Sequence, residues 1–211
     1  MAVAQRLFVH LTTVLAVIVC ILGISTSSRA DPLIFDYRGF HVDLSQVRGT
    51  MADAKLIAAV KRQIDIVEEV KLKPQVVAFM RTVSVWANPK RTGKGPGHYS
   101  RKTGIDLQMD QLEPNKPILL HELLHAFHDQ QLQGGFSNAD VEKFYERGKT
   151  AGWPADSYMM SNAHEFFAVT ASVYLYGDIP RPPESRKQLR AKQPQYYQWL
   201  ADLFDDGKAR R

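Results

Sequence analysis

The stretch 118–132, with the sequence ILLHELLHAFHDQQL, constrains the fold more than any other part of this chain. Its apolar residues surround most of a helical wheel, so the stretch predicts a helix that is buried on nearly every side. That helix nevertheless carries His121, Glu122 and His125. Burying such groups without partners costs several kcal/mol, so the folded chain must supply something that compensates them.

The pattern H-E-x-x-H supplies a reason for these polar residues. His121 and His125 lie one turn apart on the same helix face, so both imidazoles can bind one metal ion. Glu122 is rotated by about 100° and can reach a water on that metal rather than the metal itself. Bound zinc lowers the pKa of such a water toward about 7, and a carboxylate can take its proton as it attacks a carbonyl. The motif predicts one Zn²⁺ per chain; the alternative is two core histidines satisfied by neighbouring polar groups.

A third metal ligand is predicted in the downstream segment YMMSNAHEFFAVTASVYLYG. Glu165 lies there among apolar residues of a second predicted buried helix, where a carboxylate needs a cation. His164 is the main alternative ligand. Glu142 and Glu146 fall on a polar helix and are expected to face water. A metzincin would have its third histidine at the position of Gln131, so that class is excluded.

Tyr158 is a candidate for stabilising a transition state. It precedes Glu165 by seven residues, about two turns if the second helix begins early enough. From there its phenol could donate to the oxyanion of a tetrahedral intermediate. By spacing alone, an ordinary half-buried tyrosine is an equally good interpretation.

The pairing of H-E-L-L-H with Tyr-x6-Glu-Phe-Phe-Ala resembles the gluzincin peptidases similar to the lethal-factor catalytic domain. The resemblance covers about residues 75–205. It implies that His121, His125 and Glu165 bind zinc. It also implies that Glu122 is the general base and that Tyr158 stabilises the transition state.

One departure from that pattern concerns support of the metal ligands. Such enzymes often carry an acidic residue one turn after the third ligand, where this chain has Val169. Metal-bound histidines normally donate their other N–H to a carboxylate or carbonyl. Asp129 is the nearest acid, and Asn162 and Thr170 are weaker candidates. His128 lies one turn beyond His125, and we expect it to have a structural role.

Three short strands are expected outside the two buried helices. Alternating apolar residues predict them over about 40–44, 82–86 and 105–109. The polar, glycine-rich stretch 88–104 lacks the spacing of a phosphate-binding loop and predicts a surface loop.

Further helices complete the expected architecture. Helical spacing predicts one from about residue 53 until Pro74 stops it, a short one over 75–80, and others after Pro180 and Pro194. Together these elements indicate a zincin-like α+β domain, mostly helical with a small sheet. An edge of that sheet, strand 82–86 or 105–109, could bind an extended peptide by β-addition.

The N-terminus predicts export. Arg6 precedes an almost wholly apolar stretch, 7–24, and Ser28-Arg29-Ala30 is a small-residue cleavage site, which together are typical of a secretory signal peptide over 1–30. The rival interpretation is an uncleaved signal anchor through 7–24. Residues 31–211 then form a single domain without cysteine, since Cys20 is the only one, so disulfides, a thiol nucleophile and cysteine-based metal sites are excluded there.

Charge narrows the range of partners. The formal net charge is +5, but no basic stripe with interleaved aromatic residues indicates nucleic-acid binding. The sequence therefore predicts an exported, secreted or periplasmic, zinc metallopeptidase that acts on a peptide or protein. A zinc amidase acting on cell-wall peptides and a catalytically silent zinc-binding domain remain alternatives, and the sequence gives no oligomeric state.

Overall fold

The computed structural model describes residues 33–89 and 95–210. These belong to one compact unit, Asp31–Arg211. The predicted signal peptide, residues 1–30, lies outside the described residues. Within those residues, the model contains no helix with the length and apolar character needed to cross a bilayer.

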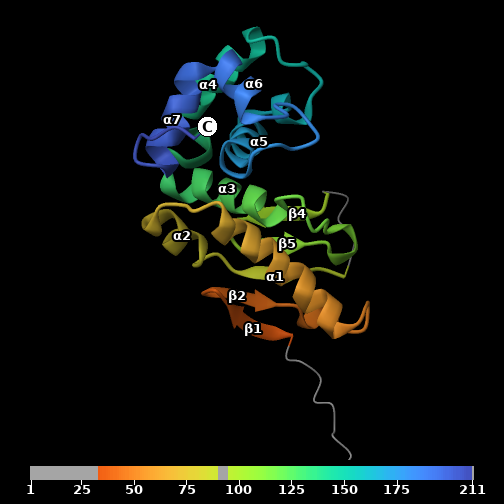
Figure 1. Ribbon diagram of the computed structural model, residues 1–211. Coiled ribbons are helices and arrows are strands. Elements are labelled where there is room, and N and C mark those ends of the chain that lie inside the picture. Colours follow the sequence, from red (N-terminus) through yellow and green to blue (C-terminus); the bar gives the residue numbers. More distant parts are fainter. Residues whose placement is uncertain (1–32, 90–94, 211) are drawn as a thin grey trace, which may run out of the picture. The chain divides into compact units, whose positions relative to one another are not determined.

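The described strands form one five-stranded mixed sheet (Figure 1). Its spatial order is β1 (Ile34–Tyr37), β2 (Phe40–Asp43), β3 (Val85–Ala87), β5 (Gly104–Leu107) and β4 (Gly97–Ser100). The pairs β2–β3 and β3–β5 are parallel, whereas the outer pairs β1–β2 and β5–β4 are antiparallel. The parallel connections require crossovers, and the first of them consists of two helices.

Helices make up most of the remaining structure. The crossover from β2 to β3 contains α1 (Asp53–Glu69) and α2 (Pro74–Met80), and the chain leaves the sheet through α3 (Ile118–Gln131). The last helices are α4 (Ala139–Thr150), α5 (Ala163–Tyr176), α6 (Arg186–Lys192) and α7 (Pro194–Phe204). In Figure 1, α3 lies between the sheet with α1 and α2 and the group formed by α4 to α7. The α+β, mostly helical class predicted from the sequence is confirmed.

Helix α3 is the centre of the core. It packs against α5, α1 and β4, and every residue from Ile118 to Asp129 is buried. The prediction of a helix buried on nearly all sides is therefore confirmed. Just after it, Gly135 has a φ of +57°, and an added Cβ would lie 2.7 Å from the carbonyl oxygen of Asp129. Only glycine fits this turn, which directs the chain away from the end of α3.

The predicted peptide-binding edge is wrong. Strands β3 and β5 exist close to the predicted ranges, but each has a neighbour on both sides. The edge next to β5 is β4, which lies inside the stretch 88–104 that the sequence predicts as loop. Of its residues, Gly-His-Tyr-Ser, only the tyrosine favours strands, and β4 is paired along its whole length with the four residues of β5.

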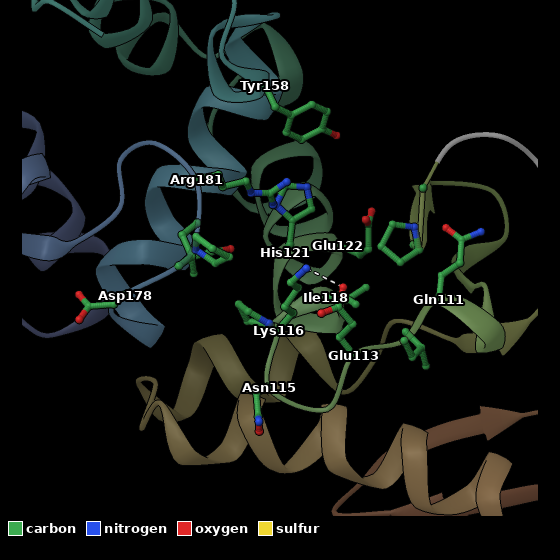
Figure 2. A pocket seen from close by; sticks show the side chains of 18 of the residues that line it. Gln111, Glu113, Asn115, Lys116, Ile118, His121, Glu122, Tyr158, Asp178 and Arg181 are labelled. Carbon is green, nitrogen blue, oxygen red and sulfur yellow. Dashed lines mark hydrogen bonds and ion pairs between the residues drawn. The ribbon is translucent and has the colours of Figure 1, made fainter. Parts of the chain in front are cut away.

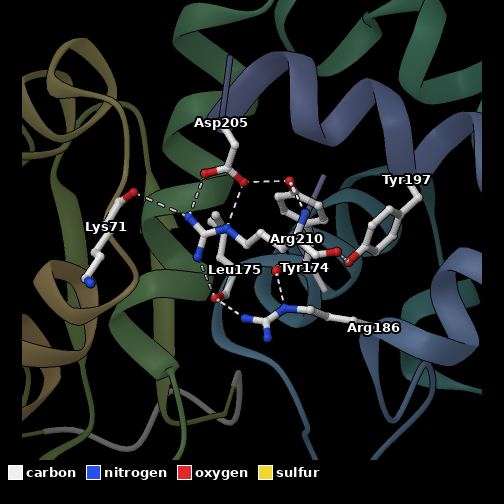
Figure 3. A network of polar contacts seen from close by, with 7 residues as sticks. All are labelled: Lys71, Tyr174, Leu175, Arg186, Tyr197, Asp205 and Arg210. Carbon is white, nitrogen blue, oxygen red and sulfur yellow. Dashed lines mark hydrogen bonds and ion pairs between the residues drawn. The ribbon is translucent and has the colours of Figure 1, made fainter. Parts of the chain in front are cut away.

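The end of α5 is fixed by arginine side chains (Figure 3). Arg186 donates to the carbonyl oxygens of Tyr174 and Leu175, both at 2.8 Å. Arg210 donates to the Leu175 carbonyl at 3.1 Å and forms an ion pair with Asp205 at 2.7 Å. The last carbonyls of a helix have no partner within it, so these contacts satisfy them and hold the start of the loop that follows α5.

Candidate metal centre

Three side chains from two helices converge on one point. His121 and His125 project from α3, and Glu165 projects from the first turn of α5. Glu165 Oε2 lies 3.2 Å from His121 Nε2 and 3.4 Å from His125 Nε2, and the two Nε2 atoms are 3.2 Å apart. Their ligand atoms fall within 4.8 Å of one another, so the group could hold a metal ion.

The chemistry of this donor set fits a cation. The two imidazoles are buried, and Glu165 Oε2 is buried without a hydrogen-bond partner among the described residues. Burial alone would raise the pKa of the Glu165 carboxyl, but the two imidazoles lower it below the usual range for glutamate. A carboxylate facing two imidazole nitrogens needs a positive charge between them, and two histidines with one glutamate form a common zinc donor set.

Asn162 places Glu165 in this position. Its side-chain oxygen accepts a hydrogen bond of 2.9 Å from the Glu165 backbone N–H and caps α5. Asparagine is a favoured N-cap because it satisfies an N–H that the helix leaves free. The cap starts α5 two residues before Glu165, which turns the carboxylate toward α3.

Glu122 lies beside the edge strand β4. Gly97 comes so close that an added Cβ would be 2.7 Å from Glu122 Cγ and 2.9 Å from its Oε1. Glu122 is buried at 7% exposure, yet it lines the same cleft as His121. The strand therefore packs directly against the side chain that the sequence predicts as the general base.

Tyr158 reaches the centre from a separate 3₁₀ turn, Tyr158–Met160, and not from α5. Its ring centroid lies 6.4 Å from that of His121, and the residue is 48% exposed. Burial of the phenol raises its pKa above that of a free tyrosine, and the negative charge of Glu165 adds to this effect. The hydroxyl stays protonated near neutral pH and can donate a hydrogen bond.

A cleft of about 1000 Å³ opens at this centre. One wall is formed by residues 95–97 and 110–113, the floor by 115–118, and the opposite wall by Tyr158 with 178–181. Figure 2 shows His121 and Glu122 at its middle, with Gln111 on one side and Asp178 and Arg181 on the other. Its volume lies at the upper end of the range typical of ligand pockets.

The other acidic and histidine candidates lie outside the group of three. His164 stacks on Phe136 with ring centroids 4.2 Å apart. His128 is fully buried, and burial followed by its imidazole neighbours lowers its pKa to about 4, so it is neutral at pH 7. Glu142 is exposed, and Glu146 pairs with Lys149 at 2.5 Å.

The residues expected to accept hydrogen bonds from the metal-binding histidines have other partners in the structure. Asp129 accepts from Tyr99 Oη at 2.8 Å and from two nitrogens of Arg101 at 2.7 and 2.6 Å. Asn162 caps α5, and Thr170 bonds to the Phe166 carbonyl. Consistent with this, His121 Nδ1 has no hydrogen-bond partner within the described part of the chain. The sequence could not show this, because Arg101 comes from the hairpin between β4 and β5.

Neither side of the cleft is predicted from the sequence. Gly97 lies in the stretch predicted as loop, and Arg181 stands at the start of the run in which a helix is predicted after Pro180, where no pattern indicates a site. The one available signal was the run Gly95-Pro96-Gly97, since glycine in a strand often marks a close approach of another group.

The chain was compared with known proteins. No protein-family model matches it. A Pro-Pro endopeptidase of Paenibacillus alvei is 28% identical over 85 residues, which is 40% of this chain and 37% of that protein's length. The solved structure of the Pro-Pro endopeptidase PPEP-2 from Paenibacillus alvei superposes with a TM-score of 0.54 and 18% identity, covering 77% of this chain and 97% of the other. The two chains share a fold.

Proposed function

We propose that this chain is a zinc-dependent peptidase of the gluzincin type. The observation that carries the proposal is the convergence of His121, His125 and Glu165 within 3.4 Å, beside a cleft that Glu122 also lines. A structural role for two core histidines would not need a buried carboxylate aimed at both. The fold shared with a Pro-Pro endopeptidase supports the same function.

Each side chain around the centre has a separate role in the reaction. Zinc held by the three ligands would act as a Lewis acid toward the scissile carbonyl and a water molecule. Glu122 takes a proton from the attacking water and delivers it to the leaving nitrogen. Tyr158 donates a hydrogen bond from its hydroxyl to the oxyanion, since a tyrosine hydroxyl is protonated near neutral pH.

The substrate is an extended peptide that lies along β4. Among the described strands, β4 has one neighbour, β5, so its other edge offers backbone groups for β-addition. Gly97 brings that edge against Glu122. The names of the relatives suggest a bond between two prolines as the first substrate to test. Export through the predicted signal peptide would place the enzyme where it meets secreted or surface proteins.

The first test is metal content together with activity. Purified residues 31–211 should contain about one zinc per chain, and Glu165→Ala should lose most of it in dialysis. Glu122→Gln should keep the zinc yet lose hydrolysis of casein and of a Pro-Pro peptide library, since it removes only the base. Full activity in Glu122→Gln, or no zinc in the parent after reconstitution, would refute the proposal.

A second measurement tests the substrate specificity separately from the peptidase activity. Internally quenched peptides that contain Pro-Pro are compared with peptides in which either proline is replaced by alanine. Cleavage of the Pro-Pro peptides alone supports the narrow specificity. Equal cleavage of all peptides keeps the peptidase and rejects the specificity.

A further inference from the structure

Arg181 is an exposed cation in the lining of the cleft. It lies in the loop after α5, is exposed, and lines the cleft that holds His121 and Glu122. Its guanidinium stands 5.1 Å from the ring centroid of Tyr158. Within residues 33–89 and 95–210, no ion pair or side-chain hydrogen bond of Arg181 is found.

The other ionisable side chains that the structure describes in the cleft lining are mainly acidic. The second described cation, Lys116, already pairs with Glu113 at 2.5 Å. Glu122 and Asp178 add two further carboxylates to the described lining, and Asp110 adds one that already has an interaction partner. Among the described side chains of the lining, outside the metal centre itself, Arg181 is therefore the cation without an ion pair, and it is the position at which a substrate carboxylate would be attracted.

The backbone holds Arg181 in place. The Arg181 N–H donates to the Ile179 carbonyl at 2.9 Å, and the Ile179 N–H donates to the Glu184 carbonyl at 3.1 Å. Directly after this loop, Arg186 binds the last carbonyls of α5. The backbone of this loop is therefore arranged before a ligand arrives, and on binding the Arg181 side chain alone has to be ordered.

We infer that Arg181 forms a subsite of the cleft that binds one carboxylate of the peptide substrate. This inference rests on the peptidase function proposed above. Tyr158 lies next to both Arg181 and His121, so the carboxylate belongs to a residue within about three extended positions of the scissile bond. It comes either from an aspartate or glutamate side chain or from the C-terminus of a short peptide. A guanidinium binds either source through paired N–H···O bonds.

The experiment is a positional scan. The best-cleaved peptide of the preceding tests receives aspartate or its neutral counterpart asparagine at each of three positions on either side of the scissile bond. Peptides truncated at each of these positions carry a free or an amidated C-terminus. In the parent, one position should favour aspartate, or one truncated peptide its free acid, by about tenfold in kcat/KM. The other positions should not favour aspartate, because Lys116, the second described cation of the lining, is already paired.

Two variants assign the preference to one side chain. Arg181→Gln should bring the aspartate-to-asparagine ratio, or the acid-to-amide ratio, close to one. Lys187→Gln removes an equal charge from exposed α6 outside the cleft, and it should leave the ratio unchanged. Arg181→Lys, which keeps the charge but not the paired donors, should retain part of the preference.

A binding assay makes this test independent of catalytic turnover. Fluorescence anisotropy with Glu122→Gln protein compares the same peptides with and without Arg181→Gln; if no peptide is cleaved, the series is built on the Pro-Pro peptide and its positions are counted from the Pro-Pro bond. Loss of a tenfold preference in binding supports the subsite even if the parent cleaves no peptide, which would refute the peptidase proposal alone. Absence of a carboxylate preference in both assays, or a preference that survives Arg181→Gln, would overturn the inference.

Discussion

Replacing Gly97 with alanine should impair catalysis without disturbing the metal site. The added Cβ would lie 2.7 Å from Glu122 Cγ and 3.1 Å from its Cδ. Gly97 does not have a positive φ, so alanine can adopt its backbone conformation. The effect of the substitution therefore comes from contact with Glu122.

The size of the effect follows from that contact. Carbon atoms in normal contact are separated by at least about 3.5 Å, so Glu122 must move by about 1 Å. Strand β4 cannot retreat easily because it is paired with β5, and α3 is buried on both sides of Glu122. A displacement of about 1 Å at a reacting group costs about 100-fold in rate, which corresponds to about 2.7 kcal/mol in activation free energy.

Steady-state kinetics on the best-cleaved peptide measures this loss as a fall in kcat. Zinc content and melting temperature should stay close to those of the parent, because the three metal ligands are not touched. Ser100→Ala is the matched control, since it changes a small group on the same strand outside the cleft. A Gly97→Ala enzyme with kcat within threefold of the parent would show that β4 does not constrain Glu122.

Two further substitutions test other parts of the structure. Tyr158→Phe should lower kcat by about 100-fold with little change in KM or zinc content, as expected for loss of one oxyanion donor; equal kcat values would remove Tyr158 from the mechanism. Asp129→Asn should lower the free energy of unfolding by about 1 to 2 kcal/mol at pH 7, measured by urea denaturation. Arg101, followed in effect by Tyr99, lowers the pKa of the folded Asp129 carboxyl despite its burial. Its stabilisation is therefore complete above the unfolded pKa of about 3.9 and is lost as the pH falls through the lower folded pKa. A difference between parent and Asp129→Asn that persists unchanged at pH 2 would contradict this assignment.

The parts of the molecule that the sequence predicts well are those with a local pattern. The helix over 118–131 follows from the spacing of its apolar residues, and its polar residues follow from a four-residue period. The position of Glu165 near both histidines is consistent with the expectation that a carboxylate in an apolar helix needs a cation. Each of these inferences uses residues within a few turns of one another.

The parts that it does not predict depend on pairing between distant or weakly patterned segments. Strand β4 has a single strand-favouring residue, Tyr99, and depends on its pairing with β5. The same hairpin brings Arg101 to Asp129, which removes the expected support for His125. Tyr158 is likewise placed by an independent turn and not by the period of α5. Side-chain competition of this kind has no signature along the chain.

The location of the ligands on two helices has a consequence for the lifetime of the protein. A metal held by His121 and His125 on α3 and by Glu165 on α5 links two segments that an unfolded chain would release. Binding to the folded state alone then adds about 2.7 kcal/mol of stability when free zinc is at 100 times its dissociation constant. For a domain of this size, that corresponds to a melting temperature about 5 to 10 °C higher. A protein built in this way would last longest where zinc is plentiful, and sequestration of zinc by a competitor would shorten its survival as well as stop its chemistry.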